Sequence, residues 1–107
     1  MKNTKPTALL ALRKEYRRYA LRMCRLLERS GCATRLVTDV AGLLAAEREA
    51  APDVIILDSA VSEPKTAEVI ADIHDRPDGG TKLIVLGLPA DQETFVRERW
   101  PDVEIIV

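Results

Sequence analysis

The chain has 107 residues, which is the size of one ordinary domain and leaves no room for a second. Hydrophobic residues make up 47% and charged residues 31%, a globular composition that excludes a disordered chain. The formal net charge of −1 and the pI near 5.8 exclude a chain-wide polycation, and the apolar runs are too short to cross a bilayer.

Two hydrophobic periods alternate along the chain, and each indicates a different kind of element. Short apolar stretches predict strands at residues 7–12, 32–37, 54–57, 82–86 and 103–107, and the runs at 7–12 and 54–57 are typical of buried strands. Apolar residues recurring three and four apart predict helices between them, at about 14–30, 39–51, 66–75 and 89–100. A loop that contains Ser62 and Pro64 is expected before the third of these helices.

The first helix carries an apolar stripe that we expect to face the core, and Gly31 stops the helix. The stripe consists of Tyr16, Tyr19, Ala20, Met23, Leu26 and Leu27. Five strands that alternate with four helices favour a parallel sheet with helices on both faces. We expect a short tail at 1–6 and one domain at 7–107. Because no helix follows the fifth strand, we expect a partner to cover the sheet face beside strands one and five, unless the sequence is a fragment of a longer chain.

Candidate site residues follow from where ligands bind in such sheets, at the carboxyl ends of the strands. The first strand is followed by Arg13, Lys14 and Glu15, the third by Asp58 and the fourth by Gly87. Asp58, directly after an apolar run, is the sharpest of these features. A carboxylate there either serves a site or simply caps the next turn.

The stretch Pro-Asp-Val-Ile-Ile-Leu-Asp, at 52–58, resembles the strand-three signature of response-regulator receiver domains, in which the last aspartate accepts phosphate. The segments 28–31, 66–73 and 82–87 resemble the family's first helix end, third helix and fourth strand, so the similarity spans nearly all of 7–107. The resemblance implies an α/β, flavodoxin-like (CheY-like), doubly wound sheet of five parallel strands in the order 2-1-3-4-5, lacking the closing fifth helix.

This sequence departs from the receiver pattern at the positions that the family's chemistry uses. The family's adjacent acids that hold Mg²⁺ fall on Arg13-Lys14 or on Lys14-Glu15, so at most one carboxylate remains. The hydroxyl-bearing switch residue falls on Gly87, and the family's lysine after strand five would lie beyond residue 107. Because Mg²⁺ takes oxygen ligands, such a site binds it poorly. We therefore expect no metal and no cofactor, with Asp58 locked in an ion pair with Arg13 or Lys14.

Basic side chains gather in the first 35 residues, which carry ten Lys or Arg and only two acids, whereas the rest of the chain is net acidic. Four arginines spaced 4, 3 and 4 lie along one side of the first helix: Arg18, Arg22, Arg25 and Arg29. This arginine row is either a solvated face, or a docking surface for a protein partner or a second copy. A second copy offers an acidic surface at Glu63, Glu68, Asp72 and Asp75. No interleaved aromatics or DNA-binding motif support direct contact with nucleic acid.

The sequence favours a non-catalytic pseudo-receiver, a signalling or interaction domain that acts through protein contacts. Its expected partners are a histidine kinase or phosphorelay-like protein, an attached output domain such as a transcription regulator, and a second copy. Two alternatives stay open: a genuine receiver phosphorylated on Asp58, and a small anionic-ligand or nucleotide-binding domain that uses Arg13 and Lys14. Cys24 and Cys32 form no CxxC motif, which indicates free thiols and a cytoplasmic location.

Overall fold

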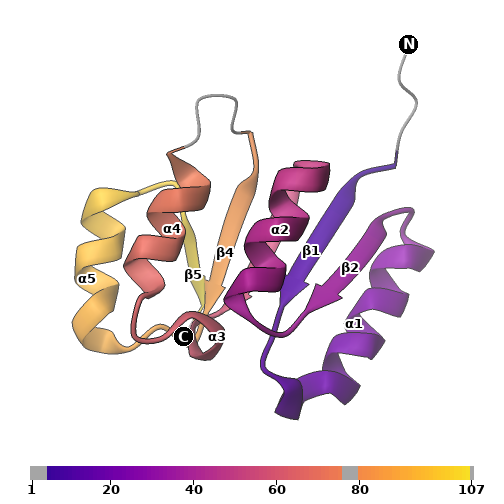
Figure 1. The fold of residues 1–107 in the computed structure, drawn as a ribbon, viewed down its shortest axis with the longest axis horizontal. Coiled ribbons are helices and arrows are strands. Elements are labelled where there is room, and N and C mark those ends of the chain that lie inside the picture. Colours follow the sequence, from indigo (N-terminus) through magenta and orange to yellow (C-terminus); the bar gives the residue numbers. More distant parts are fainter. Residues whose placement is uncertain (1–4, 76–79, 107) are drawn as a thin grey trace.

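The computed structural model describes residues 5–75 and 80–106 and contains one five-stranded parallel sheet (Figure 1). The strands are β1 (Thr7–Ala11), β2 (Ala33–Val37), β3 (Val54–Asp58), β4 (Lys82–Leu86) and β5 (Glu104–Ile106). Their order is β2-β1-β3-β4-β5, and all neighbouring pairs are parallel. The predicted fold class and strand order are therefore confirmed.

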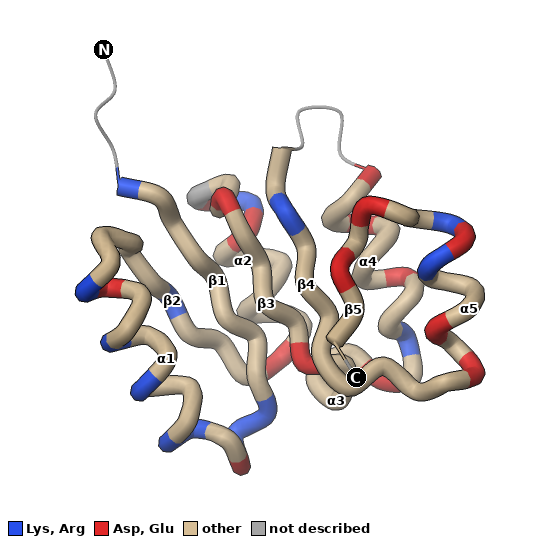
Figure 2. Tube along the Cα trace, turned by 180° about the vertical axis from the view of Figure 1, so that it is seen from behind, with Lys and Arg blue, Asp and Glu red and all other residues tan. Residues whose placement is uncertain are grey.

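Helices cover the two faces of this sheet unequally. The helical elements are η1 (Lys14–Tyr16), α1 (Arg17–Arg29), α2 (Val40–Ala50), α3 (Ser59–Ser62), α4 (Thr66–His74) and α5 (Ala90–Arg99). On one face α2, α4 and α5 pack a large core, in which Leu43, Ile70 and Val96 meet the buried side chains of β3 and β4. On the other face a smaller cluster joins Ala20 and Cys24 of α1 to Leu10 of β1. Figure 2 shows this second side, with α1 before one half of the sheet and no described helix before β3, β4 and β5.

The predicted inner stripe of the first helix is partly wrong. Residues 14–16 form the separate turn η1, and the core-facing residues of α1 are Ala20 and Cys24, with Met23 and Leu27 partly buried. Tyr16, Tyr19 and Leu26 are exposed. Tyr19 and Leu26 lie on a flank of α1 where the structure describes no neighbouring helix, so their spacing is helical but nothing covers them.

A second difference concerns the segment after β3, where a loop was expected. Residues 59–62 form the short helix α3 instead, and Glu63-Pro64 is a cis peptide bond. Buried hydroxyl groups hold this segment, because Ser62 Oγ lies 2.9 Å from Thr66 Oγ1 at the start of α4. Of the expected domain limits, residues 1–4 and 107 lie outside the described part of the chain.

Candidate functional site

The candidate site lies at the carboxyl ends of β1 and β3, which are neighbours in the sheet. Asp58 is the last residue of β3 and is only 2% exposed. Arg13 follows β1 after one further residue and adopts an extended backbone, which turns the chain into η1. Because parallel strands end at the same edge, the sheet itself brings these two residues together.

Arg13 binds the Asp58 carboxylate through two side-chain nitrogens. Its Nε donates a hydrogen bond to Oδ2 at 2.8 Å, and its Nη2 donates to Oδ1 at 2.9 Å. Such two-point pairs match the planar guanidinium to the planar carboxylate and are stronger than neutral hydrogen bonds. The Arg13 side chain is 37% exposed and its Cζ lies 4.6 Å from the ring centroid of Tyr16, so one side of the guanidinium rests on an aromatic face.

Two backbone groups complete the shell around Asp58. The Arg13 N–H donates to Oδ2 at 3.2 Å, and the Ala60 N–H donates to Oδ1 at 3.1 Å. The second bond makes Asp58 the N-cap of α3, which is the structural role that the sequence left open beside a functional one. Each carboxylate oxygen therefore accepts one bond from the guanidinium and one from the backbone.

These contacts fix the charge state of the pair. Burial alone would raise the pKa of Asp58, but the hydrogen bonds from the Arg13 side chain and from two backbone N–H groups outweigh it and lower the pKa below its usual value. The same bond to Asp58 raises the pKa of Arg13 further above its already high value. Asp58 is thus a carboxylate and Arg13 a cation throughout the physiological range of pH.

The other two residues after β1 do not add ligands to this site. Lys14 and Glu15 lie on the exposed surface of η1. Across the described ranges 5–75 and 80–106, no group of three or more His, Cys, Asp and Glu side chains is arranged to hold a metal ion. A hard cation such as Mg²⁺ needs free carboxylate oxygens, and here a guanidinium already lies against both oxygens of Asp58. The residues present therefore do not fit the magnesium site of receiver domains.

Gly87, at the predicted switch position, lies beside the same edge of the sheet. Its backbone has a φ of 68°, a left-handed conformation that glycine adopts readily, and its N–H donates to the Ile106 carbonyl oxygen at 2.8 Å. The Ser59 Oγ donates to the Gly87 carbonyl oxygen at 2.8 Å. A hydroxyl therefore lies next to Asp58 along the chain, but it ties α3 to the end of β4.

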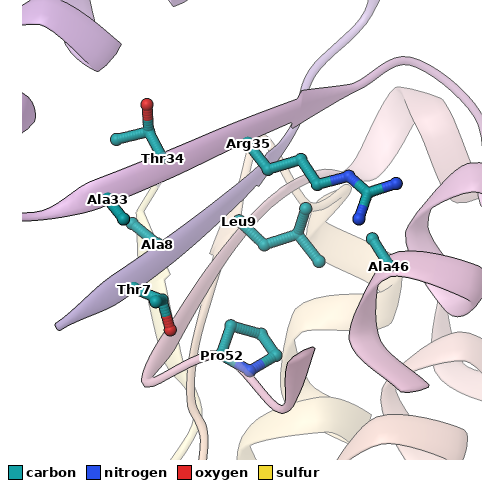
Figure 3. A pocket seen from close by; sticks show the side chains of 8 residues that line it. All are labelled: Thr7, Ala8, Leu9, Ala33, Thr34, Arg35, Ala46 and Pro52. Carbon is teal, nitrogen blue, oxygen red and sulfur yellow. The ribbon is translucent and has the colours of Figure 1, made fainter. Parts of the chain in front are cut away.

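A pocket is present, but at the other end of the strands (Figure 3). Its lining includes Thr7 and Leu9 of β1, Arg35 of β2 and Pro52 before β3. The Arg35 guanidinium there pairs with Glu49 of α2, with Nη1 and Oε2 3.0 Å apart. This pocket is thus remote from Arg13 and Lys14, the two cations expected to bind an anionic ligand.

The charged surfaces that the sequence predicts lie on opposite sides of the sheet. All four members of the arginine row are exposed on α1, where Figure 2 shows basic residues along the helix. The acidic residues belong to α4 and its flanks, on the face that α1 does not cover. No described helix is long and apolar enough to span a membrane.

Comparisons with known proteins give a match in structure but none in sequence. No family model and no curated protein match this sequence. Among solved structures, a response regulator receiver domain (CheY-like) from Methylobacillus flagellatus matches with a TM-score of 0.72 and 16% identity, over 97% of this chain and 86% of that one. The chain has the CheY-like receiver fold.

Two further structures that match this chain are a response regulator and a pseudo-receiver domain. A response regulator from Thermotoga maritima matches with a TM-score of 0.72 and 19% identity, over 95% of this chain and 83% of that one. The pseudo-receiver domain of the CikA protein matches with a TM-score of 0.64 and 16% identity, over 97% of this chain and 83% of that one. The TM-scores establish the receiver fold of the chain. At identities this low, the chemistry of the chain has to be argued from the residues of its own site.

Proposed function

We propose that this chain is a non-catalytic pseudo-receiver, a signalling domain of a bacterial-type regulator that works through protein contacts without magnesium-dependent phosphorylation. The observation that carries the proposal is the two-point ion pair between Arg13 and Asp58. The receiver fold supports a role in signalling, and the pair argues against a phosphoacceptor role for Asp58. The proposed setting is the cytoplasm, where free thiols such as Cys24 and Cys32 persist.

The chemical argument concerns the oxygens of Asp58. To accept a phosphoryl group, one carboxylate oxygen must attack phosphorus, and a cation must neutralise the charge on the transferred group. In this chain both oxygens accept bonds from Arg13, and the backbone N–H of Ala60 adds another. A nucleophilic attack would have to break the guanidinium contact first, and among the residues that the structure describes no second carboxylate joins Asp58 to bind Mg²⁺.

The proposed partners are proteins. Candidates are a kinase or phosphorelay-like protein, an attached output domain and a second copy of the chain, whereas direct contact with nucleic acid is not part of the proposal. The exposed arginine row on α1 and the acidic residues of α4 supply the charge for such contacts.

The test is treatment with Mg²⁺ and acetyl phosphate, followed by intact mass measurement. We expect no phosphoryl adduct on the wild-type protein and none on Asp58→Asn, which serves as the control. A stoichiometric adduct on the wild type that is absent from Asp58→Asn would instead make the chain a genuine receiver phosphorylated on Asp58. The single variant Arg13→Asp, which replaces the guanidinium by a second carboxylate, is treated in the same way. A phosphoryl adduct on this variant alone would show that Arg13 prevents the phosphorylation of Asp58.

A further inference from the structure

We infer that a groove between α2 and α4 is the docking site for helix α1 of a second copy of the chain. The inference rests on the proposed function, because it gives one of the proposed partners, the second copy, a specific contact. Both helices lie on the face of the sheet that α1 does not cover (Figure 1). The groove between them has a volume of about 380 Å³.

The floor of the groove is apolar. It is formed by Val40 and Leu44 of α2 and Val69 of α4, with Pro64 in the segment between α3 and α4. Val69 is buried, whereas Val40 and Leu44 pack against the large core and remain partly exposed. Leu44 follows Val40 by four residues, so both lie on the same side of α2. An apolar side chain from outside can therefore be buried between the two helices.

Three carboxylates and one ammonium group line the α4 side of the groove. The carboxylates belong to Glu63, Glu68 and Asp72, which are exposed, and the ammonium group belongs to Lys65. Glu68 and Asp72 lie one turn apart on α4, about 6 Å along the helix. Within residues 5–75 and 80–106, none of the three carboxylates forms an ion pair. The groove therefore favours an occupant with an apolar centre and a cationic edge.

The outer side of α1 has this chemistry. The arginine row is exposed, and in the described part of the chain its members form no ion pair. The row contains two pairs with the one-turn spacing of the acids on α4: Arg18 with Arg22, and Arg25 with Arg29. Leu21 is 40% exposed and lies three residues after Arg18 and four before Arg25, so it borders the row.

The flank of α1 that carries Leu21 lies beside an edge of the sheet. Glu28, seven residues after Leu21 and on the same flank, accepts a hydrogen bond from Thr34 Oγ1 of β2 at 2.7 Å. The strand β2 is the outermost strand on that side. Leu21 is thus an apolar side chain next to exposed cations at the edge of the molecule, and we place it on the floor of the groove.

The contact requires two copies of the chain. Within one copy the arginine row and the groove lie on opposite faces of the sheet, so they cannot meet. Between two copies, α1 can lie along the groove at an interhelical distance of about 8–10 Å, with arginines facing Glu68 and Asp72. Because the row and the groove are different surfaces, each copy can use its row on one neighbour and its groove on another.

An exchange of charge between two variants tests the contact. The row variant carries Arg18→Glu, Arg22→Glu, Arg25→Glu and Arg29→Glu. The groove variant carries Glu68→Lys and Asp72→Lys. In each variant the row and the groove have the same sign, so we expect self-association at least about tenfold weaker than that of the wild type. In an equimolar mixture each row meets a groove of opposite sign, and we expect association to return. Sedimentation velocity at low salt measures the three samples.

Three single variants separate the groove from general effects of charge. Leu21→Ser keeps every charge and should weaken self-association about fivefold, because it removes the side chain that we place on the floor. Glu68→Lys should weaken self-association as well. Glu98→Lys is its matched control, since Glu98 is exposed on α5 outside the groove, and it should leave self-association unchanged. Circular dichroism and thermal unfolding confirm that each variant is folded.

Three outcomes would overturn the inference. A wild-type protein that stays monomeric at low salt would show that no second copy docks. Self-association that persists in both charge variants would place the contact on another surface. Two variants that stay monomeric when mixed would show that the row does not bind the groove. Each result leaves the assignment of Asp58 standing, because that depends on the phosphorylation test, and a phosphoryl adduct on Asp58 would leave this contact standing.

Discussion

Asp58 combines almost complete burial with a full negative charge, two properties that conflict unless the charge is paired. A buried carboxylate without partners would take up a proton, because burial favours the neutral form. Here the guanidinium of Arg13 and two backbone N–H groups supply four hydrogen bonds to its two oxygens. These four hydrogen bonds therefore offset the cost of burying the charge.

Removing the guanidinium should expose this dependence. We expect Arg13→Met, which keeps an unbranched side chain, to lower the free energy of unfolding because the buried Asp58 carboxylate loses its charged partner. The orphaned carboxylate costs about 1–3 kcal/mol. Urea denaturation measures the change directly.

A double-mutant cycle provides the control for Arg13→Met. Asp58→Asn alone leaves the guanidinium partly exposed to water, and adding it to Arg13→Met removes the buried charge. The double variant should therefore be more stable than Arg13→Met. If Arg13→Met were as stable as the wild type, the pair would have no structural role.

Elements rather than residues explain why so much of the fold could be predicted from the sequence. The strands β1, β3 and β4 are short apolar runs. In β3 and β4 the side chains on the large-core face are buried and most of those on the other face are partly exposed, but the runs still stand out from the helices between them. The receiver resemblance then supplied the strand order. Asp58 and Gly87 could be selected as site residues because both directly follow such runs.

The sequence could not predict features that depend on neighbours distant along the chain. Arg13 and Lys14 are adjacent cations, and only the turn into η1 directs Arg13 to Asp58 and Lys14 to solvent. The helix α3 has four residues, too few for any periodic pattern. Tyr19 and Leu26 have the spacing of core residues, and whether such a flank is buried depends on whether another helix packs against it.

The end of α4 and the turn after α5 are held together by a histidine. His74 Nδ1 lies 3.1 Å from Asp75 Oδ1, and its Nε2 lies 2.8 Å from Asp102 Oδ2. Burial alone would lower the pKa of His74, but the hydrogen bonds to Asp102 and Asp75 outweigh it and raise the pKa above the ordinary value of 6.5. Only the protonated ring donates from both nitrogens at once, so this connection belongs to the cationic form.

The free energy of unfolding should therefore fall as pH rises above 6.5 and through the raised pKa of His74. The contribution of His74 is complete below pH 6.5, its ordinary value, and is lost as pH rises through the raised pKa of the folded state. Urea denaturation at a series of pH values measures the loss. His74→Gln should remove this component, and Asp102→Asn should reduce it. A wild-type profile that matched His74→Gln would contradict the role of His74.

At the scale of the whole molecule, the opposite placement of basic and acidic surfaces constrains self-association. The arginine row on α1 and the acidic residues of α4 lie on opposite faces of the sheet. A contact between α1 of one copy and α4 of another therefore joins two different surfaces. It leaves the α4 surface of the first copy and the α1 surface of the second copy free. Such a dimer differs from a two-fold symmetric one, because it can add a third copy.

Light scattering across a salt series tests the predicted homodimer. At low salt we expect a mass above the 11.9 kDa of one chain. The mass should fall toward that of a monomer as salt rises, because the Debye length shrinks from about 10 Å at 0.1 M to about 3 Å at 1 M. Arg25→Glu should weaken the association at low salt, and Arg97→Glu on α5 is a charge-matched control outside the arginine row. A monomer at every salt concentration would exclude this interface.

The shell of four donors around Asp58 also bears on how such a domain carries information. A switch needs two states and a ligand or modification that favours one of them. In the proposed pseudo-receiver the carboxylate is already held by an internal cation, so no external phosphate or metal selects between states. The fraction of its partner that such a domain binds then depends on the concentration of the domain and on competing partners. Its signalling would be regulated by expression level and mass action, without chemistry at the aspartate.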